Sequence, residues 1–328
     1  MASVPRTLGG TTSLLVLAIA TGSLVGGASP GLAQTATQWI DPVLLVLMFL
    51  LLFELPLGGV LRGATNVRFI ALAWTLNFLV IPFVGFAVAS LFLGAEPLFF
   101  LGLMIYFVAP CTDWYLGFTR LVGGNVALGA ALLPINMATQ LLLFPVYMTV
   151  FGSGNVHPVE LTALVEWFFQ PLAAAMAARL LLHRIVDRLL PVCSAAIPAV
   201  LALLVALIFA ANVDSLPAHL TIVPQVLLAV FCFFSVTFVL SEWAARVVRL
   251  DFPEHSLLSF TTGARNAPLM LGLATVAYPD QPLIYTAITI GMLIEFPHLA
   301  AMKWVFLNRR KRGPSRRSVQ LEWQKGRP

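Results

Sequence analysis

The chain has 328 residues, of which 59% are hydrophobic and 10% are charged, whereas an ordinary soluble domain carries roughly 25% charged residues. This composition excludes a water-soluble globular protein. The net charge of +5 would indicate a nucleic-acid partner only if the basic residues formed one patch, and their positions along the chain indicate a membrane topology instead.

Apolar stretches of about 20 residues, the length that crosses a bilayer core, recur from one end of the chain to the other. The first of them also resembles a signal peptide, because Arg6 precedes it and the small residues Gly31-Leu32-Ala33 follow it. If the first helix is retained, the number of spans is even and the basic residues of the loops all fall on one side of the membrane. We therefore predict an all-α membrane protein with ten transmembrane helices, near 12–32, 39–60, 67–93, 97–121, 126–152, 160–184, 192–212, 221–249, 255–279 and 282–307.

Apart from Arg265, which lies inside a span, the basic residues occupy only alternate loops and the two ends of the chain. They are Arg6, Arg62, Arg68, Arg120, Arg179, Arg184, Arg188, Arg246, Arg249 and the tail from Lys303. The other loops carry no Lys or Arg, and their acidic residues are Asp41, Glu96, Glu160, Asp214 and Asp280. The positive-inside rule then places both termini in the cytoplasm and the protein in the inner (plasma) membrane. We interpret the basic tail as a topology anchor that contacts the lipid bilayer, and we expect no nucleic-acid partner.

Ten spans divide into two sets of five, and an odd number per set means that the second set enters the membrane in the opposite orientation. This inverted repeat predicts four segments: a cytoplasmic N-terminus at 1–11, a first five-helix repeat at 12–152, a second, inverted five-helix repeat at 153–307 and a basic cytoplasmic tail at 308–328. Transporters built in this way usually place their binding site where one helix of each half is interrupted.

The fourth and ninth spans each contain helix-breaking and polar residues. Span four contains Ala109-Pro110-Cys111-Thr112-Asp113-Trp114, and span nine contains Thr261-Thr262-Gly263-Ala264-Arg265-Asn266-Ala267-Pro268. Proline removes a backbone donor, glycine permits unwound dihedral angles, and freed backbone groups are tolerated at that depth only against protein or a watery cavity. We expect the two broken helices to cross beside a binding cavity. The alternative is that Pro110, Gly263 and Pro268 only kink packed helices.

Three ionisable residues, Asp113, Arg265 and Glu295, lie deep in the apolar stretches. Each costs about 3 kcal/mol at a helix centre on insertion scales, which selects against an idle charge. One interpretation is a proton or substrate site. The other is a structural pair between Arg265 and either Asp113 or Glu295, and the two interpretations are compatible.

Uncharged polar residues and one cysteine complete the candidate site. Asn136 and Gln140 lie four residues apart on one face of a helix, where they would bond the broken backbone, a solute hydroxyl or simply a neighbouring helix. Cys111 follows a proline at a helix break, where a soft thiolate would make a transient contact with a thiophilic metalloid; buried cysteines are also commonly inert. Cys193 and Cys232 are interpreted as packing residues. No Cys or His spacing indicates a disulfide, a resident metal or a cofactor.

An enzyme is not expected, because the chain has no HExxH motif, no GxSxG motif and no histidine-rich cluster. The histidines are scattered along the chain at His157, His183, His219, His255 and His298.

Three segments of the chain carry motifs of one transporter family, and they follow one another in the same order as in that family. Phe260-Thr261-Thr262-Gly263-Ala264-Arg265-Asn266 is similar to a T-x-x-A-R-N segment, and Gly291-Met292-Leu293-Ile294-Glu295-Phe296-Pro297 is similar to G-P-L-I-E-x-P. Cys111, Gly124 and Asn136-x-x-x-Gln140 have the spacing of a third motif. The chain resembles, over nearly its whole length, the bile acid/arsenite transporter superfamily, and within it most resembles the arsenical-resistance permeases that export arsenite.

The resemblance implies that Cys111 and Glu295 move trivalent arsenite or antimonite outward, against protons, and that Arg265 and Asn266 line the crossing. Two departures leave the substrate open. Ala109-Pro110-Cys111 stands where the family usually has Ala-Arg-Cys, and Thr112-Asp113-Trp114 replaces an apolar run.

The sodium-coupled bile-acid branch typically has E-T-G-x-Q-N on span nine, where the acidic residue and the glutamine help to hold sodium. Thr261 and Arg265 stand at those two places here. A guanidinium puts a fixed positive charge where a cation would bind, which argues against a sodium site. We therefore expect a secondary transporter that exports arsenite in exchange for protons. The alternative is a sodium- or proton-coupled symporter of an organic anion, which Arg265 and half-helix N-termini would hold.

Overall fold

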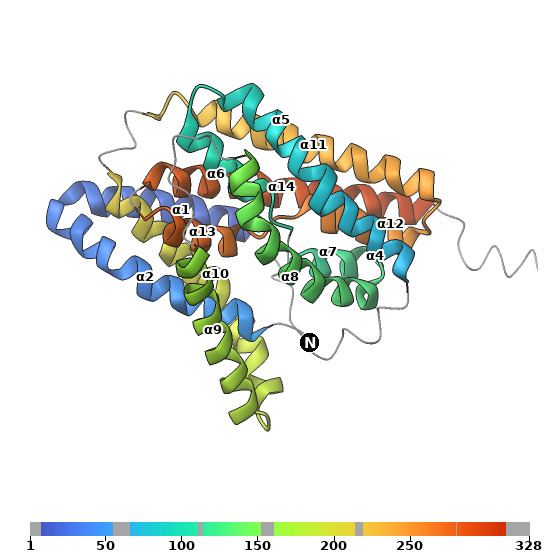
Figure 1. The fold of residues 1–328 in the computed structure, drawn as a ribbon, viewed down its shortest axis with the longest axis horizontal. Helices are drawn as coiled ribbons and strands as arrows, with labels where there is room; N and C mark the ends of the chain where they lie inside the picture. Colours follow the sequence, from blue (N-terminus) through green and yellow to red (C-terminus); the bar gives the residue numbers. More distant parts are fainter. Residues whose placement is uncertain are drawn as a thin grey trace, which may run out of the picture.

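A computed structural model of the protein describes residues 8–54, 66–110, 114–151, 161–213, 219–279 and 281–312. These residues form helices and no strand, apart from one isolated antiparallel bridge between Pro110 and Arg265. Figure 1 shows α1 and α2 at one end of the molecule, α4 and α12 at the other, and α5 and α11 along the upper side. The elements are α1 (Leu8–Ala28), α2 (Pro30–Phe53), α4 (Val67–Thr75), η1 (Leu76–Val80), α5 (Ile81–Leu93), α6 (Pro97–Phe107), α7 (Trp114–Val122), α8 (Val126–Phe151), α9 (Leu161–Leu181), α10 (Val186–Ala211), α11 (Val223–Val248), α12 (Phe252–Gly263), α13 (Ala267–Ala277) and α14 (Pro282–Arg312).

The apolar ranges predicted from the sequence overlap described helices, but 12–32 runs past the end of α1 into α2, and the count of ten spans stays a prediction. Within the described ranges, five helices are long and apolar enough to cross a membrane, and six if the two pieces of α8, bent by 52°, count as one span. The halves α6 and α7 have 11 and 9 residues, and α12 and α13 have 12 and 11, so each half is too short to cross alone. The protein is a multi-pass helical membrane protein.

The boundary between the first two predicted spans differs from the structure. The predicted spans 12–32 and 39–60 left residues 33–38 in a loop between them, but α2 begins at Pro30, with Ser29 as its N-cap. The Ser29 hydroxyl accepts a hydrogen bond from the Leu32 N–H at 3.3 Å, and proline is favoured in a first helical turn. The Thr35 hydroxyl donates to the Gly31 carbonyl four residues earlier at 2.8 Å. The hydroxyl group is thus hydrogen-bonded within the helix, and a polar residue at this position is compatible with helix.

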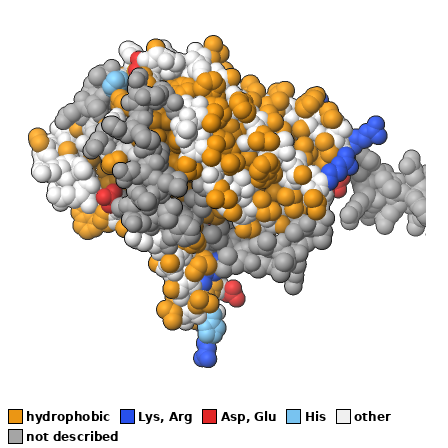
Figure 2. All heavy atoms as spheres, viewed as in Figure 1, with side chains coloured by type: hydrophobic (Ala, Val, Ile, Leu, Met, Phe, Trp, Pro, Cys, Tyr) orange, Lys and Arg blue, Asp and Glu red, His pale blue; other side chains and the backbone are white. Residues whose placement is uncertain are grey.

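The outer surface is that of a protein surrounded by lipid. Figure 2 shows hydrophobic side chains over most of the visible face, with Lys and Arg at its margins. Several large apolar side chains on α5 and α11 are exposed, including Leu91 at 77% and Val239 at 65%. A soluble monomer rarely exposes a contiguous apolar surface of this kind.

The helices form two sets, which we call the panel (α1, α2, α9 and α10) and the crossing bundle (α4 to α8 and α11 to α14). Within the panel, α10 packs on α1 and α2, and α9 packs on α2. A Cβ added at Gly22 or Gly26 of α1 would lie 2.2 or 2.1 Å from the carbonyl oxygens of Ala206 and Ala210. Close contact of this kind between small residues is a common way to pair membrane helices. The two sets meet where α14 contacts α1 and α10 and where α13 contacts α2 and α9.

The third predicted span is continuously helical from Val67 to Leu93, with a π-helical turn at Leu76–Val80. Proline has no N–H to give to the carbonyl four residues earlier, so Pro82 leaves the Phe78 carbonyl without its helical donor. The Phe78 carbonyl instead accepts a hydrogen bond from the Tyr147 hydroxyl of α8 at 2.6 Å. Asn77, within the π-helical turn, is fully buried.

Candidate functional site

The two helix breaks lie against each other. Pro110, after α6, and Arg265, between α12 and α13, form the antiparallel bridge, and the Asn266 N–H donates to the Ala109 carbonyl at 3.0 Å. Proline has no N–H, so it can take part in such a pairing only as an acceptor. The predicted crossing of the fourth and ninth spans is thus a short main-chain contact between two unwound segments.

Arg265 sits at the ends of two half-helices. Its Nη1 donates to the Phe107 carbonyl at the end of α6 at 3.0 Å, and its Nη2 donates to the Thr262 carbonyl near the end of α12. The guanidinium also lies 5.7 Å from the ring centre of Phe233. Helix C-termini carry partial negative charge and unpaired carbonyls, so one buried cation satisfies both ends. These contacts account for an arginine whose side chain is 1% exposed.

Glu295 of α14 hydrogen-bonds to both broken spans, through the main chain of Arg265 and the side chain of Tyr106. Its Oε1 accepts a hydrogen bond from the Arg265 backbone N–H at 2.8 Å, and its Oε2 accepts one from the Tyr106 hydroxyl at 2.7 Å. The residue is 3% exposed. A carboxylate is an acceptor at both oxygens and a donor once protonated, so a change in its protonation changes what it can bond at the junction of α6, α13 and α14.

The other residues predicted at the break have structural positions. Gly263 is the last residue of α12, and a Cβ there would lie 3.0 Å from the sulfur of Met302. Asn266 is the N-cap of α13, and its Oδ1 accepts from the Leu269 N–H at 3.3 Å. Pro268 lies in the first turn of α13, where its missing N–H has no consequence. Together they end one half-helix and start the next.

Asn136 and Gln140 of α8 are buried with unsatisfied polar atoms. Asn136 is 0% exposed, and neither its Oδ1 nor its Nδ2 has a hydrogen-bond partner within the described parts of the chain. Gln140 donates from Nε2 to the sulfur of Met270 on α13 at 3.4 Å, while its Oε1 has no partner there. A buried amide without partners costs about 1–3 kcal/mol, so its retention indicates a ligand or water that completes it.

Asn77 is a residue that the sequence interpretation missed. Its Nδ2 donates to the Thr261 hydroxyl at 3.5 Å, and its Oδ1 is buried without a partner among the residues described. Thr261 lies on α12, two residues before Gly263. The signal in the sequence was a lone amide in an apolar span, five residues before Pro82. Asn77 adds a third buried amide to the two on α8.

The predicted soft contact lies outside the described residues. Cys111 and Asp113 belong to the segment 111–113, which the structure does not describe, so Cys111 and Asp113 stay predictions. Among the residues that are described, no group of three or more His, Cys, Asp and Glu could hold a metal ion. Cys193 and Cys232 are free and half-buried.

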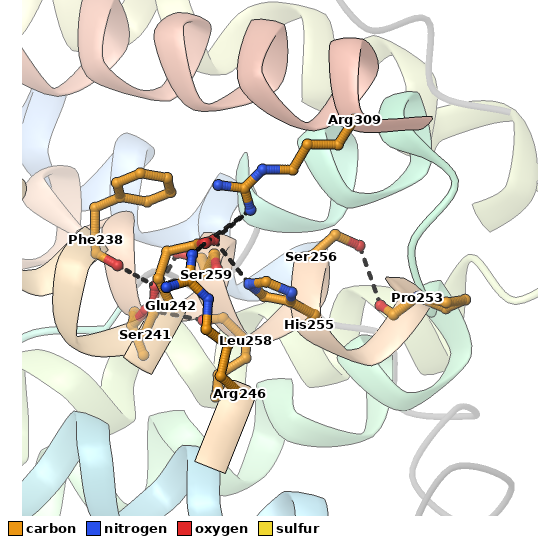
Figure 3. A network of polar contacts seen from close by, with 11 residues as sticks. Phe238, Ser241, Glu242, Arg246, Pro253, His255, Ser256, Leu258, Ser259 and Arg309 are labelled. Atoms are coloured by element: carbon orange, nitrogen blue, oxygen red, sulfur yellow. Dashed lines mark hydrogen bonds and ion pairs between the residues drawn. The ribbon is translucent and has the colours of Figure 1, made fainter. Parts of the chain in front are cut away.

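A second polar cluster lies near the ends of α11 and α14 (Figure 3). Glu242 of α11, 5% exposed, accepts from Arg309 Nη1 at 2.8 Å on Oε1 and 2.7 Å on Oε2. His255 Nε2 of α12 lies 2.7 Å from its Oε1, and Arg246 Nη2 lies 3.4 Å from its Oε2. This cluster ties three helices of the crossing bundle together, and the sequence interpretation did not predict it.

A cavity of about 380 Å³ lies between the panel and the crossing bundle. Its lining is mostly apolar, and includes Ile19 of α1, Phe209 of α10 and Ile290 of α14. None of the residues predicted for the site lines it. The cavity marks the contact surface between the two sets of helices and is separate from the crossing.

Comparison with known proteins agrees with the motifs. The profile of the family described as "Sodium Bile acid symporter family" matches residues 41–219. The chain is also 24% identical over 320 residues to the "Arsenical-resistance protein Acr3" of Corynebacterium glutamicum, an alignment that covers 89% of this chain and 86% of the relative. Both findings confirm the resemblance predicted from the three motifs. Because the profile covers more than half of the chain, the protein belongs to the sodium bile acid symporter family.

Proposed function

We propose that this transporter exports arsenite or antimonite across the cytoplasmic membrane in exchange for protons. The observation that carries the proposal is Asn136, fully buried with both amide atoms unpartnered, on the helix that bonds α13 through Gln140. The similarity to a protein named for arsenical resistance supports the choice of solute.

The chemistry of the buried amides suits a small neutral hydroxylated solute. Undissociated arsenite presents three hydroxyl groups, each a donor and an acceptor. Asn136 offers one donor and one acceptor, and Gln140 and Asn77 each offer a buried acceptor. These groups would bond hydroxyls without the cost of burying a charged solute. Cys111, at the neighbouring break, would be the transient soft contact.

Glu295 would couple the solute to protons. With its carboxylate bonded to the Arg265 N–H and the Tyr106 hydroxyl, the junction of α6, α13 and α14 is held together. Protonation turns one oxygen into a donor, which competes with these bonds and favours a second arrangement of the crossing bundle against the panel. Binding a proton from outside and releasing it inside would then drive one solute outward per cycle.

The organic-anion alternative is not favoured by the contacts of Arg265. Its guanidinium donates to the carbonyls of Phe107 and Thr262, so it would bind a carboxylate only after those half-helix ends lost their donors. Apolar lining alone, as in the cavity between panel and bundle, does not supply a positive charge for an anion.

The topology that goes with this function is also a proposal. Ten spans, an inverted pair of five-helix repeats at 12–152 and 153–307, and cytoplasmic segments at 1–11 and 308–328 would place the basic loops inside. Cysteine accessibility at Arg188→Cys and Glu160→Cys in whole cells would test it. We expect labelling by a membrane-impermeant reagent only at position 160.

The function is tested by arsenite uptake into everted vesicles under an imposed pH gradient, with and without sodium. We expect accumulation that depends on the pH gradient, is unchanged by sodium, and is lost in Cys111→Ala and Glu295→Gln. Full accumulation in Cys111→Ser would contradict the role of the thiol. No arsenite movement through the wild-type protein would refute arsenite export, and uptake of labelled organic acids would then be measured.

A further inference from the structure

His298 of α14 is a partly buried titratable residue that the proposed mechanism does not yet use. It follows Glu295 by three residues on the same helix, a spacing that puts two side chains about 5–6 Å apart on one face. Its ring stacks on Phe234 of α11, with centroids 5.0 Å apart and planes 20° apart, and meets the edge of Phe238 at 6.3 Å. The imidazole therefore lies between α14 and α11, one turn from the candidate proton site.

The Nε2 atom of His298 faces the break of span nine. It is buried and has no hydrogen-bond partner within the described ranges, and it lies 3.9 Å from the position that a Cβ on Gly263 would take. A histidine kept only for packing would be expected to bond both ring nitrogens or to expose one. The unpaired Nε2 is therefore the candidate proton acceptor at this place.

Two aromatic rings, and then the Glu242 cluster, follow His298 along α11, away from the crossing. On α11, Phe234, Phe238 and Glu242 are spaced four residues apart, so one stripe carries both rings that contact His298 and then the carboxylate. Beside this stripe, the Ser241 hydroxyl donates to the Ser259 hydroxyl of α12 at 3.1 Å (Figure 3). In the proposed topology this direction is towards the cytoplasm.

The structure gives contacts for several charged and titratable groups on the helices around His298. On α12 the Thr262 hydroxyl donates to the Ser259 carbonyl at 3.1 Å, and the Thr262 carbonyl accepts from Arg265. In the described part of the chain, the charged and titratable groups on these helices include Glu295 on α14, Arg265 between α12 and α13, Tyr106 on α6, Glu242 and Arg246 on α11, Glu254 and His255 on α12, and Lys303, Arg309, Arg310 and Lys311 towards the end of α14.

We propose that His298 receives the proton that leaves Glu295 and passes it towards the cytoplasm. The O–H bond of the Glu295 carboxyl group breaks, an N–H bond forms at Nε2 of His298, and the products are a carboxylate and an imidazolium. The imidazolium then gives its proton to water at the cytoplasmic end, and the imidazole returns to its neutral state. The carboxylate regains its bonds to Arg265 and Tyr106. This inference rests on the proposed proton exchange and adds a second proton-carrying residue to it.

Transport measurements in proteoliposomes separate this role from a structural one. We expect His298→Gln to reduce arsenite accumulation driven by a pH gradient about tenfold, the effect of a poorly placed proton acceptor, while arsenite counterflow at equal pH stays within about twofold of the wild type. The matched control is His219→Gln, since His219 precedes α11 at the end away from the Glu242 cluster, with its ring centre 5.6 Å from that of Phe99; it should change neither quantity. Equal loss of both activities in His298→Gln, or loss of neither, would overturn the proposal.

A titration that needs no solute decides the proposal independently of arsenite export. Nitrogen NMR of the full chain in lipid, with ring-labelled histidine, reports each of the five histidines, and the signal missing in His298→Gln belongs to His298. If the two groups share a proton, Glu295→Gln should move the midpoint of that signal by at least about one pH unit. Gln keeps an oxygen acceptor for the Arg265 N–H, so the fold should persist. An unchanged midpoint would overturn the proposal, whether or not arsenite crosses the membrane.

Discussion

In the panel, α1 approaches α10 so closely that a Cβ on Gly26 would lie 2.1 Å from a main-chain oxygen, whereas in the crossing bundle the helices are joined by side-chain and main-chain hydrogen bonds. Every buried polar or charged side chain among the described residues lies in the bundle, on α4 to α8 and α11 to α14 or at their breaks, and none lies on α1, α2, α9 or α10. Apolar packing holds most of the panel, with one hydrogen bond from Arg179 Nη1 of α9 to the Phe53 carbonyl of α2 at 2.8 Å, and the bundle is held around Glu295 and Arg265.

The two sets of helices differ in where polar side chains are buried. Polar groups at membrane depth are costly and are commonly functional, which is why the proposed mechanism assigns the solute and the proton to the bundle. A nearly apolar face, by contrast, has few bonds to break when it slides. The panel therefore suits a support against which the bundle moves. Four substitutions test this division, and they are ordered here by the size of the expected effect.

Glu295→Gln should have the largest effect. It keeps the shape of the side chain and removes its titration, so the pH-driven rate of arsenite accumulation should fall by about 100-fold, a typical loss for a group that transfers a proton. The measurement is initial uptake into everted vesicles at several imposed pH gradients. Retained dependence on the gradient would show that the proton is carried elsewhere.

Gly26→Ala should destabilise the panel without touching the chemistry. The new Cβ would meet the Ala210 carbonyl at 2.1 Å, and a main-chain shift of that kind costs about 1–3 kcal/mol. Thermal unfolding in detergent would measure the loss, with Gly27→Ala as the matched control, because its Cβ would lie 3.9 Å from Val213. If both variants were equally stable, close contact with α10 would not hold the panel together.

Asn136→Leu should separate function from stability. Leucine removes an amide whose two polar atoms are unpaired, so the unfolding temperature should stay the same or rise, as it does when an unsatisfied polar group is removed. Uptake should fall about tenfold, the equivalent of about 1.4 kcal/mol for one lost hydrogen-bonding group. A lower unfolding temperature would show that the amide has partners in the folded protein and would argue against a solute contact.

Tyr106→Phe should have the smallest effect of the four. It removes one of the two donors that hold Glu295, a loss of about 1 kcal/mol, and we expect uptake to fall about threefold to fivefold. Tyr115→Phe is the control, since the Tyr115 hydroxyl is equally buried but donates to the Gly129 carbonyl of α8. Equal effects of the two changes on uptake would mean that the Tyr106 hydroxyl acts only through stability.

Local sequence patterns predicted the family, the helical class and the two breaks. The motif around Arg265 and the one around Glu295 led to a family that the profile match confirms, and Pro110, Gly263 and Pro268 lie at the observed ends of half-helices. The count of ten spans and the inverted repeat stay predictions, and so does the thiol contact of Cys111, which lies outside the described residues. The polar stretch before residue 39 was wrongly assigned to a loop.

The sequence by itself determined what depends on near neighbours along the chain. Apolar length decides whether a segment enters the membrane, and proline or glycine decides where its helix ends. The contacts between residues far apart in the chain became visible only in the folded structure. The two carbonyls that hold the Arg265 guanidinium, the burial of Asn77 beside Thr261 and the position of His298 against α11 all join segments far apart in the chain. Such contacts depend on how helices pack together, and a one-dimensional pattern does not contain that arrangement.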